Sequence, residues 1–331
     1  MMKIGIETES CHLWLQNRRM DIFGFIDKAA EFGFDGVMIN LIEKKNQTEG
    51  LGALGPDDPE HIARVAQAIR RHGMFVELDT RGTDPAHLAH ILDVAEQLGA
   101  DVVRTFVMSG GGYSHGNLAG SFDPEAFARA AQQLRELVPL LQKKRIRLAV
   151  ENHELETIGE ILALVEQVDS PWVGVHLDVG NTMMAWEDPL EATLQAAHRT
   201  VTTHIKDHII CRNGPDGPAV VCGVPLGEGN LDLEAICRVL YARSTLQRLI
   251  IEMCYPYASP FQRPAGTGGV SRTGSGAFAE RPAPYPAEQV KPLDYYLYEG
   301  PLLETMLQDQ LEGMRRSGEF LRSLCRRIEQ G

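Results

Sequence analysis

The stretch PWVGVHLDVGN, residues 171–181, ends a run of apolar residues with a carboxylate and then a glycine. From Trp172 to Val179 the run has the composition of a buried strand, and Asp178 is the one acidic residue in it. Burying a carboxylate is unfavourable unless another group binds it. A metal ion would be such a group, so the ends of other strands are the places to look for further ligands.

Short β-rich segments alternate with amphipathic segments along the whole chain. Helices with an Asp N-cap followed by Pro are expected at residues 58–73 and 123–138. Repeated strand–helix units with right-handed crossovers close into a (β/α)₈ TIM barrel, here a single domain over residues 1–331. A doubly wound open sheet is the alternative, but no G-x-G-x-x-G follows an early strand. Strands are expected at residues 3–8, 36–41, 75–80, 102–107, 147–152, 173–178, 202–207 and 248–253.

Residues 256–300 interrupt this alternation after the eighth strand. The segment is rich in Pro and Gly and is much longer than an ordinary barrel loop. A flexible insertion is one interpretation, but the segment also carries several Tyr and Phe residues, which disordered regions usually lack. We therefore expect an ordered lid or a partner-binding arm, followed by an eighth outer helix at residues 301–328.

Composition limits the function classes. The 331 residues are 44% hydrophobic and carry a net charge of −13, which argues against binding nucleic acid or an anionic membrane. Six cysteines occur without a C-x-x-C pair, so reduced thiols in a cytoplasmic protein are expected rather than a disulfide framework or a zinc ribbon. The chain starts without a signal-peptide pattern and has no apolar run of membrane-spanning length.

Metal-ligand residues close four of the expected strands. The active site of a TIM barrel lies at the C-terminal ends of its strands, so these side chains should meet at one mouth. Each residue alone could belong to a buried ion pair, but their recurrence in register favours a single divalent metal. The mostly oxygen set suits Mn²⁺ or Mg²⁺ and can accommodate Co²⁺ or Zn²⁺. The four residues are Glu151, Asp178, His204 and Glu252.

Such a site suits removal of a proton next to a carbonyl, because a cation stabilises the enediolate that forms. His153 lies two residues after Glu151 and is the candidate general base, unless loop backbone occupies its ring. Lys206 has the same relation to His204 and is a second catalytic candidate, unless it forms a structural ion pair. His176 shares the side of Asp178 and could hydrogen-bond a ligand or the substrate.

Two loops at the expected mouth offer substrate contacts, although both could be solvent-facing connections. The loop after the first strand contains Trp14, Gln16 and Arg18, which can stack on or hydrogen-bond a sugar. The glycine-rich loop after the fourth strand contains Tyr113 and His115, but it lacks the Lys-Ser/Thr of a P-loop.

Four motifs together resemble one family over most of the chain. VENHE (150–154), GVHLDVGN (174–181), THIKDH (203–208) and GVPLGEGNLDLEAI (223–236) are similar to motifs of the xylose isomerase-like TIM barrels, the sugar phosphate isomerase/epimerase superfamily. The resemblance implies one divalent metal, commonly Mn²⁺, at the four ligand positions. It also implies that Glu151 and Glu252 can act as proton-transfer bases on opposite faces of the substrate.

Two departures from that family bear on the reaction. Its ketose 3-epimerases usually have a histidine where this chain has Asn181 and an arginine where it has Ile210. The motifs look closer to the branch of keto-sugar lyases, which includes 3-oxo-isoapionate decarboxylases and C-glycoside deglycosidases. With Asn181 at the mouth as a further substrate contact, a metal-dependent β-elimination on a keto-sugar or keto-glycoside is expected.

The alternatives are a sugar isomerase or epimerase, a zinc endonuclease of the apurinic type, and a sugar-binding barrel without catalysis. The endonuclease needs more strand-end histidines and a basic surface. A homo-oligomer is expected, with a small second subunit as an option.

Overall fold

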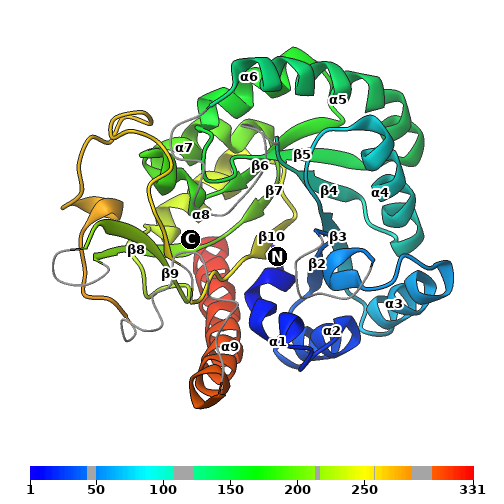
Figure 1. Cartoon of the computed structure of the whole chain (residues 1–331), viewed down its shortest axis with the longest axis horizontal. Helices are drawn as coiled ribbons and strands as arrows, with labels where there is room; N and C mark the ends of the chain where they lie inside the picture. Colours follow the sequence, from blue (N-terminus) through cyan, green and yellow to red (C-terminus); the bar gives the residue numbers. More distant parts are fainter. Residues whose placement is uncertain (43–49, 108–121, 213–216, 257, 285–299) are drawn as a thin grey trace.

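The computed structural model describes residues 1–42, 50–107, 122–212, 217–256, 258–284 and 300–331. Eight parallel strands form a barrel, and helices surround it (Figure 1). The strands are β1 (Lys3–Glu7), β2 (Gly36–Asn40), β3 (Phe75–Asp79), β4 (Val102–Thr105), β5 (Arg147–Glu151), β6 (Val173–Asp178), β7 (Thr200–His204) and β10 (Arg248–Ile251). All eight predicted strands are present, in the sheet order β10-β1-β2-β3-β4-β5-β6-β7.

Ile205 joins the two edge strands of this sheet. Its N–H donates to the carbonyl of Ile250 at 2.7 Å, and its carbonyl accepts the N–H of Glu252 at 3.2 Å. These bonds bring β7 beside β10. The TIM-barrel prediction is confirmed, and the open-sheet alternative is wrong.

Helices cover the outside of the barrel with their apolar faces. Asp58 and Asp123 cap α3 and α5 as predicted, with Pro in the first turn of each helix. α5 runs beyond the predicted end at residue 138, because Leu141 continues its buried face past Pro139. The helices are α1 (His12–Gln16), α2 (Ile22–Glu31), α3 (Pro59–Arg71), α4 (Pro85–Leu98), α5 (Pro124–Lys144), α6 (Ile158–Val168), α7 (Pro189–Ala196), α8 (Leu233–Arg243) and α9 (Gly300–Gln330), with 3₁₀ turns η1 (Thr8–Cys11), η2 (Gly52–Leu54), η3 (Asn181–Ala185), η4 (Ala197–Arg199) and η5 (Gly276–Phe278).

A small antiparallel sheet follows β7, where the sequence predicted one strand over residues 202–207. Its strands are β8 (Asp207–Arg212), β9 (Ala219–Val224) and β11 (Ala258–Ser259), in the order β11-β9-β8. The Asp207 carboxylate accepts the N–H groups of Gly227 and Gly229, both at 2.9 Å, and of Leu231 at 3.2 Å. Asp207 therefore starts a new strand and fixes the loop after β9, instead of ending β7.

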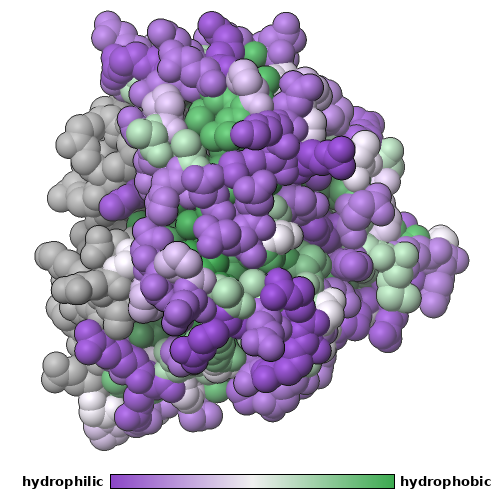
Figure 2. Space-filling view, turned by 90° about the vertical axis from the view of Figure 1, so that its right-hand side faces the viewer, coloured by the Kyte–Doolittle hydropathy of each residue, from purple (hydrophilic) through white to green (hydrophobic). Residues whose placement is uncertain are grey.

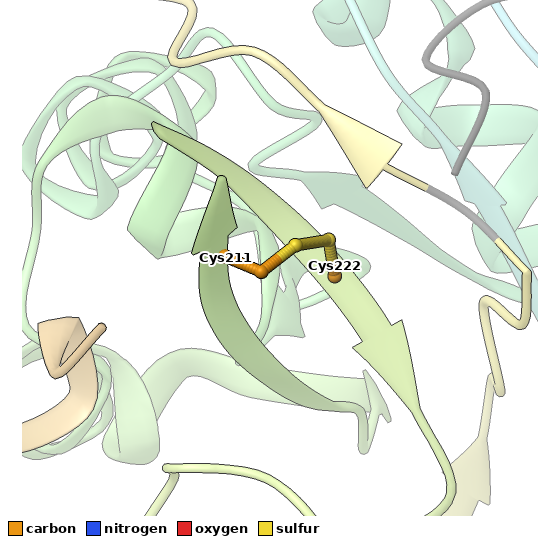
Figure 3. The surroundings of a disulfide bond; sticks show 2 residues. All are labelled: Cys211 and Cys222. Carbon is orange, nitrogen blue, oxygen red and sulfur yellow. A yellow bond between two sulfur atoms is a disulfide. The ribbon is translucent and has the colours of Figure 1, made fainter. Parts of the chain in front are cut away.

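Cys211 and Cys222 form a disulfide across β8 and β9 (Figure 3). The antiparallel register pairs Cys211 with Val220 and Cys222 with Ile209, which places the two Cα atoms 6.6 Å apart. The expectation that all six thiols are reduced is wrong for this pair, because the β8–β9 hairpin brings two cysteines 11 residues apart side by side. The other four cysteines are buried and free.

The described part of the insertion, residues 258–284, packs beside the β8–β9 hairpin (Figure 1, orange). Trp186 stacks on Phe261 with ring centroids 3.9 Å apart and on Phe278 at 5.7 Å. The Trp186 indole N–H donates to the carbonyl of Arg263 at 3.0 Å. These contacts give part of the predicted insertion a defined position on the barrel. The remainder, Tyr257 and residues 285–299, lies outside the described residues.

The side of the barrel at the right of Figure 1, where α3 and α4 lie, has a mainly hydrophilic surface with small separate apolar groups (Figure 2). Such a surface is normal for helices that bury one face against strands. No helix within the described ranges combines the length and apolarity needed to span a bilayer.

Candidate metal centre and active site

The four predicted metal ligands meet at the C-terminal mouth of the barrel. Glu151 ends β5, Asp178 ends β6, His204 ends β7, and Glu252 directly follows β10. One ligand atom from each residue lies within 4.8 Å of the others. Neighbouring parallel strands end at the same edge, so the sequence spacing becomes spatial proximity.

His204 lies at the centre of this group. Its Nδ1 atom is 3.2 Å from Glu151 Oε1, 3.5 Å from Asp178 Oδ2 and 2.5 Å from Glu252 Oε2. Its Nε2 atom lies 3.2 Å from the sulfur of Met38. One imidazole nitrogen carries at most one proton and cannot satisfy three carboxylates, whereas a cation between them could. The residues present therefore fit a divalent ion.

Charge balance around the mouth supports the same conclusion. Glu7 and Asp79 are buried beside the three carboxylate ligands, which makes five acidic groups in all. Within the described ranges, Arg104 and Lys206 are the only buried Arg or Lys side chains. Buried charges need partners, so an additional positive charge would stabilise this arrangement.

The environment shifts the pKa values of the cluster in different directions. Burial raises the pKa of Glu151 to about 7, even though Arg104 and His204 act against it. Burial also opposes ionisation of Asp178, but Lys206 and His204 together lower its pKa to about 2. Glu252, likewise opposed by burial, has a pKa well below the ordinary value because His204 and Lys206 face it. Glu151 is thus the least readily ionised of the three carboxylates before a cation is added.

Asp178 has two different oxygens, and this explains the sequence around it. Oδ1 accepts the N–H groups of Gly180 and Asn181, both at 2.9 Å, while Oδ2 faces the cluster and lies 2.8 Å from Lys206 Nζ. Asn152 hydrogen-bonds both the N–H and the carbonyl of Asp178 at 2.9 Å. The backbone therefore aims one oxygen of Asp178 at the ligand position.

The glycine that follows is required by close packing. A Cβ atom at Gly180 would lie 2.5 Å from the His208 ring and 2.8 Å from the Lys206 Cβ. No real Cβ makes contacts of this length, so any other residue would displace β8 or Lys206. The DVGN motif thus combines a candidate metal ligand with the space that Lys206 needs.

The structure adds three residues that the sequence analysis did not select. The Arg104 guanidinium pairs with Asp79 and with Glu151 Oε2. Glu7 ends β1 and accepts a hydrogen bond from the Thr8 hydroxyl at 2.9 Å. Glu7 and Asp79 are polar strand ends, so the rule that identified the four ligands could have found them. Arg104 gave a signal too, because it is a lone charge in the apolar strand VVRTFV.

His153 lies at the same edge, in the loop after β5. Its ring stacks on Phe106 with centroids 4.1 Å apart, and its backbone N–H donates to Glu156 Oε2 at 2.9 Å. The Arg104 guanidinium lies over the same Phe106 ring at 4.9 Å. His153, the candidate base, and Arg104, which pairs with Glu151, therefore both contact the Phe106 ring.

Lys206 and Asn181 lie beside the ligands. The Lys206 ammonium is 2.8 Å from Asp178 Oδ2 and 2.8 Å from Glu252 Oε2, and it donates to Asn181 Oδ1 at 3.3 Å. Burial opposes its charge, but these carboxylates keep its pKa well above the ordinary value. Lys206 is therefore a fixed positive charge at the mouth. His176 is fully buried, and its ring meets the His204 ring edge-on at 4.1 Å.

The other predicted substrate contacts fall in different places. The Trp14 indole N–H donates to the Leu307 carbonyl of α9 at 2.7 Å, so that polar group has a structural partner. Gln16 is buried, and neither atom of its amide forms a hydrogen bond among the described residues. Arg18 is in the left-handed conformation with φ 55°. Tyr113 and His115 lie outside the described residues.

Comparison with known proteins places this geometry in a family. The family model of the xylose isomerase-like TIM barrel matches residues 26–269 of this chain. The chain is 30% identical over 199 residues to 3-oxo-isoapionate decarboxylase of Pectobacterium atrosepticum, covering 60% of this chain and 68% of that protein. The protein therefore belongs to the xylose isomerase-like TIM-barrel family. It is an enzyme, as predicted.

Two solved structures share the fold. D-psicose 3-epimerase from Clostridium cellulolyticum H10, determined with D-tagatose, matches 96% of this chain and 98% of its own, with a TM-score of 0.63 and 14% identity. The IOLI protein, determined with a zinc atom, matches 95% of this chain and 96% of its own, with a TM-score of 0.57 and 15% identity. At these identities the comparison concerns the fold alone.

Proposed function

We propose that the protein is a divalent-metal-dependent lyase that acts on a keto-sugar or 3-keto-glycoside. It removes a proton next to the carbonyl, and a substituent on the adjacent carbon is then eliminated. The relative with 30% identity is a decarboxylase of an oxo acid, whose reaction also develops negative charge beside a carbonyl. The substrate class is transferred from that relative.

The observation that favours a lyase over a two-base epimerase is the position of Arg104. This guanidinium occupies Oε2 of Glu151, while Oε1 faces His204 at 3.2 Å. Arg104 therefore holds one oxygen of Glu151, and the side chain is fully buried. Glu252 retains 11% exposure of its side chain, so the two glutamates are not equivalent bases. Epimerisation by proton transfer on opposite faces would need both.

His153 is the proposed base. It accepts the proton from the carbon next to the carbonyl, and the C–H electrons form a C=C bond as the bond to the leaving group breaks. The leaving group departs with the electron pair of the broken bond and takes a proton from water. Lys206 stabilises negative charge during this step, since it stays protonated beside Glu252. A divalent ion held by Glu151, Asp178, His204 and Glu252 would supply a Lewis acid that polarises the carbonyl.

Substrate recognition is assigned to residues around this centre. The unsatisfied amide of buried Gln16 and the Asn181 amide can bind sugar hydroxyl groups. Arg263 of the insertion donates to the Leu155 carbonyl at 3.0 Å, in the loop that carries His153. We infer from this contact that the insertion acts as a lid for bulky substrates.

The test uses the Mn²⁺-loaded enzyme in D₂O with a panel of 3-keto-glycosides and free ketoses, followed by NMR. A lyase releases the eliminated group from a 3-keto-glycoside and gives no epimer of a ketose. Epimer formation with deuterium incorporation, and no released group, would replace the lyase by an epimerase. The metal-stripped protein is the control for background elimination.

A further inference from the structure

We propose that the barrel has a second ion position that overlaps the first and prefers zinc. Its ligands are Glu151, His176 and His204, whose ligand atoms lie within 4.8 Å of one another. The inference rests on the proposed metal-dependent function, because Glu151 and His204 belong to both positions. It goes further in assigning His176 to metal binding and in predicting competition between two kinds of ion.

His176 has the burial and the unpaired ring nitrogens expected of a metal ligand. The side chain is fully buried, and within the described part of the chain neither ring nitrogen makes a hydrogen bond. Its Nε2 atom lies 3.7 Å from Glu151 Oε1, beyond hydrogen-bond distance. Buried polar groups are normally paired, so two unsatisfied nitrogens in one ring require an explanation. An ion between the two imidazoles and Glu151 would provide one.

The backbone directs His176 to this place. It precedes Asp178 by two residues on β6, so both side chains point to the same side of the strand. The register pairs His176 with Glu151 of β5. On the other side, the pairing with β7 shifts between Val175 and His176. Such irregularities reorient side chains and are frequent beside active sites. His176 therefore places the second position deeper in the barrel than Asp178, by two residues along β6.

The two positions differ in chemistry. The first position, here called outer, is formed by Glu151, Asp178, His204 and Glu252. Its three carboxylates and one imidazole suit hard ions such as Mn²⁺ or Mg²⁺. The second position, here called inner, is formed by Glu151, His176 and His204. Its two imidazoles and one carboxylate are a combination found in catalytic zinc sites. His204 Nδ1 has one lone pair, so it can bind an ion in one position at a time. Zn²⁺ in the inner position should thus exclude the harder ion from the outer one.

Affinity measurements on His176 variants test the proposal. Zn²⁺ binding is measured by competition with a chromogenic chelator, and Mn²⁺ binding by the EPR signal of the free ion. We expect His176→Ala to weaken Zn²⁺ binding about tenfold or more, with Mn²⁺ affinity changed by less than about threefold. His176→Phe keeps a ring of similar volume without a ligand nitrogen, so it gives the same test in case His176→Ala disturbs folding. His208→Ala is the matched control, because His208 is equally buried but outside the ligand set.

Crystals soaked with Zn²⁺ alone provide an independent readout. An anomalous peak at about 2.0–2.1 Å from His176 Nε2 supports the inner position. A zinc peak bound to Asp178 and Glu252, or equal zinc affinity in wild type and His176→Ala, overturns it. Either of those results leaves the proposed metal-dependent function intact. Wild-type protein that binds neither ion would overturn both proposals.

Discussion

Arg104 binds one oxygen of Glu151 and leaves the other facing His204. The same guanidinium also pairs with Asp79, which connects the ends of β3, β4 and β5. A buried cation between two carboxylates fixes their orientation before any metal binds. This fixed orientation supports the proposed roles of Glu151 as a metal ligand and of His153 as the general base.

Asp178→Asn should abolish metal binding while the fold persists. The Asn side-chain oxygen can still accept the N–H groups of Gly180 and Asn181, but it brings no charge to the cation. We expect the variant to contain less than about a tenth of the wild-type metal, measured by inductively coupled plasma mass spectrometry. Asp188→Asn is the matched control, because Asp188 accepts two backbone N–H groups at the start of α7, away from the centre. Wild-type metal content in Asp178→Asn would refute the ligand assignment.

His153→Ala should retain the metal and lose roughly two to four orders of magnitude in kcat, the range expected for a missing general base. The exposed His198→Ala serves as control. A small loss at His153, together with solvent deuterium in recovered ketose, would instead favour proton transfer by the glutamates.

Arg263→Ala should affect large substrates more than small ones. Arg263 contacts the Leu155 carbonyl and pairs with Glu160 at 3.2 Å, so its loss loosens the insertion at the His153 loop. We expect KM for a 3-keto-glycoside with a bulky aglycone to rise about tenfold, and KM for a small ketose to stay unchanged. Arg272→Ala, an exposed change in the same segment, should leave both values unchanged. Equal effects on the two substrates would argue against a lid.

Reduction of the Cys211–Cys222 disulfide should lower stability. The bond joins cysteines 11 residues apart, and its restriction of the unfolded chain should raise the unfolding free energy by about 3 kcal/mol. This is an upper value where the unfolded chain already forms part of the hairpin. Dithiothreitol should lower the unfolding free energy of wild type and have no further effect on Cys222→Ala. Denatured, unreduced protein should show four reactive thiols, matching the four free cysteines. Six reactive thiols would show that the bond is absent.

Glu187 should make stability fall between acidic and neutral pH. Burial raises the pKa of this carboxyl from 4.5 to about 7, although the Ile158 N–H acts against the rise. The folded state therefore holds a proton that the unfolded state has released, and Glu187 by itself contributes a decrease in stability of about 3 kcal/mol as pH rises from about 4.5 to 7. Glu187→Gln should remove most of this decrease in denaturant titrations at pH 5 and pH 8. Exposed Glu191→Gln should behave like wild type, and an unchanged profile in Glu187→Gln would contradict the assignment.

Periodicity and strand-end chemistry were sufficient to predict the barrel and to bring Glu151, Asp178, His204 and Glu252 together. Periodicity and polar strand ends can both be recognised within one segment. The parallel topology then determines which strand ends are neighbours. Three features could not be predicted in this way. The disulfide depends on hairpin register, the Arg104 bridge depends on which buried strand faces which, and the free nitrogens of His176 depend on what the barrel interior leaves unpaired. Each depends on contacts between different strands, which the residue pattern within one strand does not determine.

The bonds of Ile205 have a consequence for how the centre and the barrel depend on each other. Ile205 lies between His204 and Lys206, and its two hydrogen bonds to Ile250 and Glu252 join the first and last edges of the sheet. An ion held by His204 and Glu252 would span the same seam from the side-chain direction. Local opening of the seam and release of the ion are then one cooperative event, so ligand binding should protect this part of the backbone from opening more than any other.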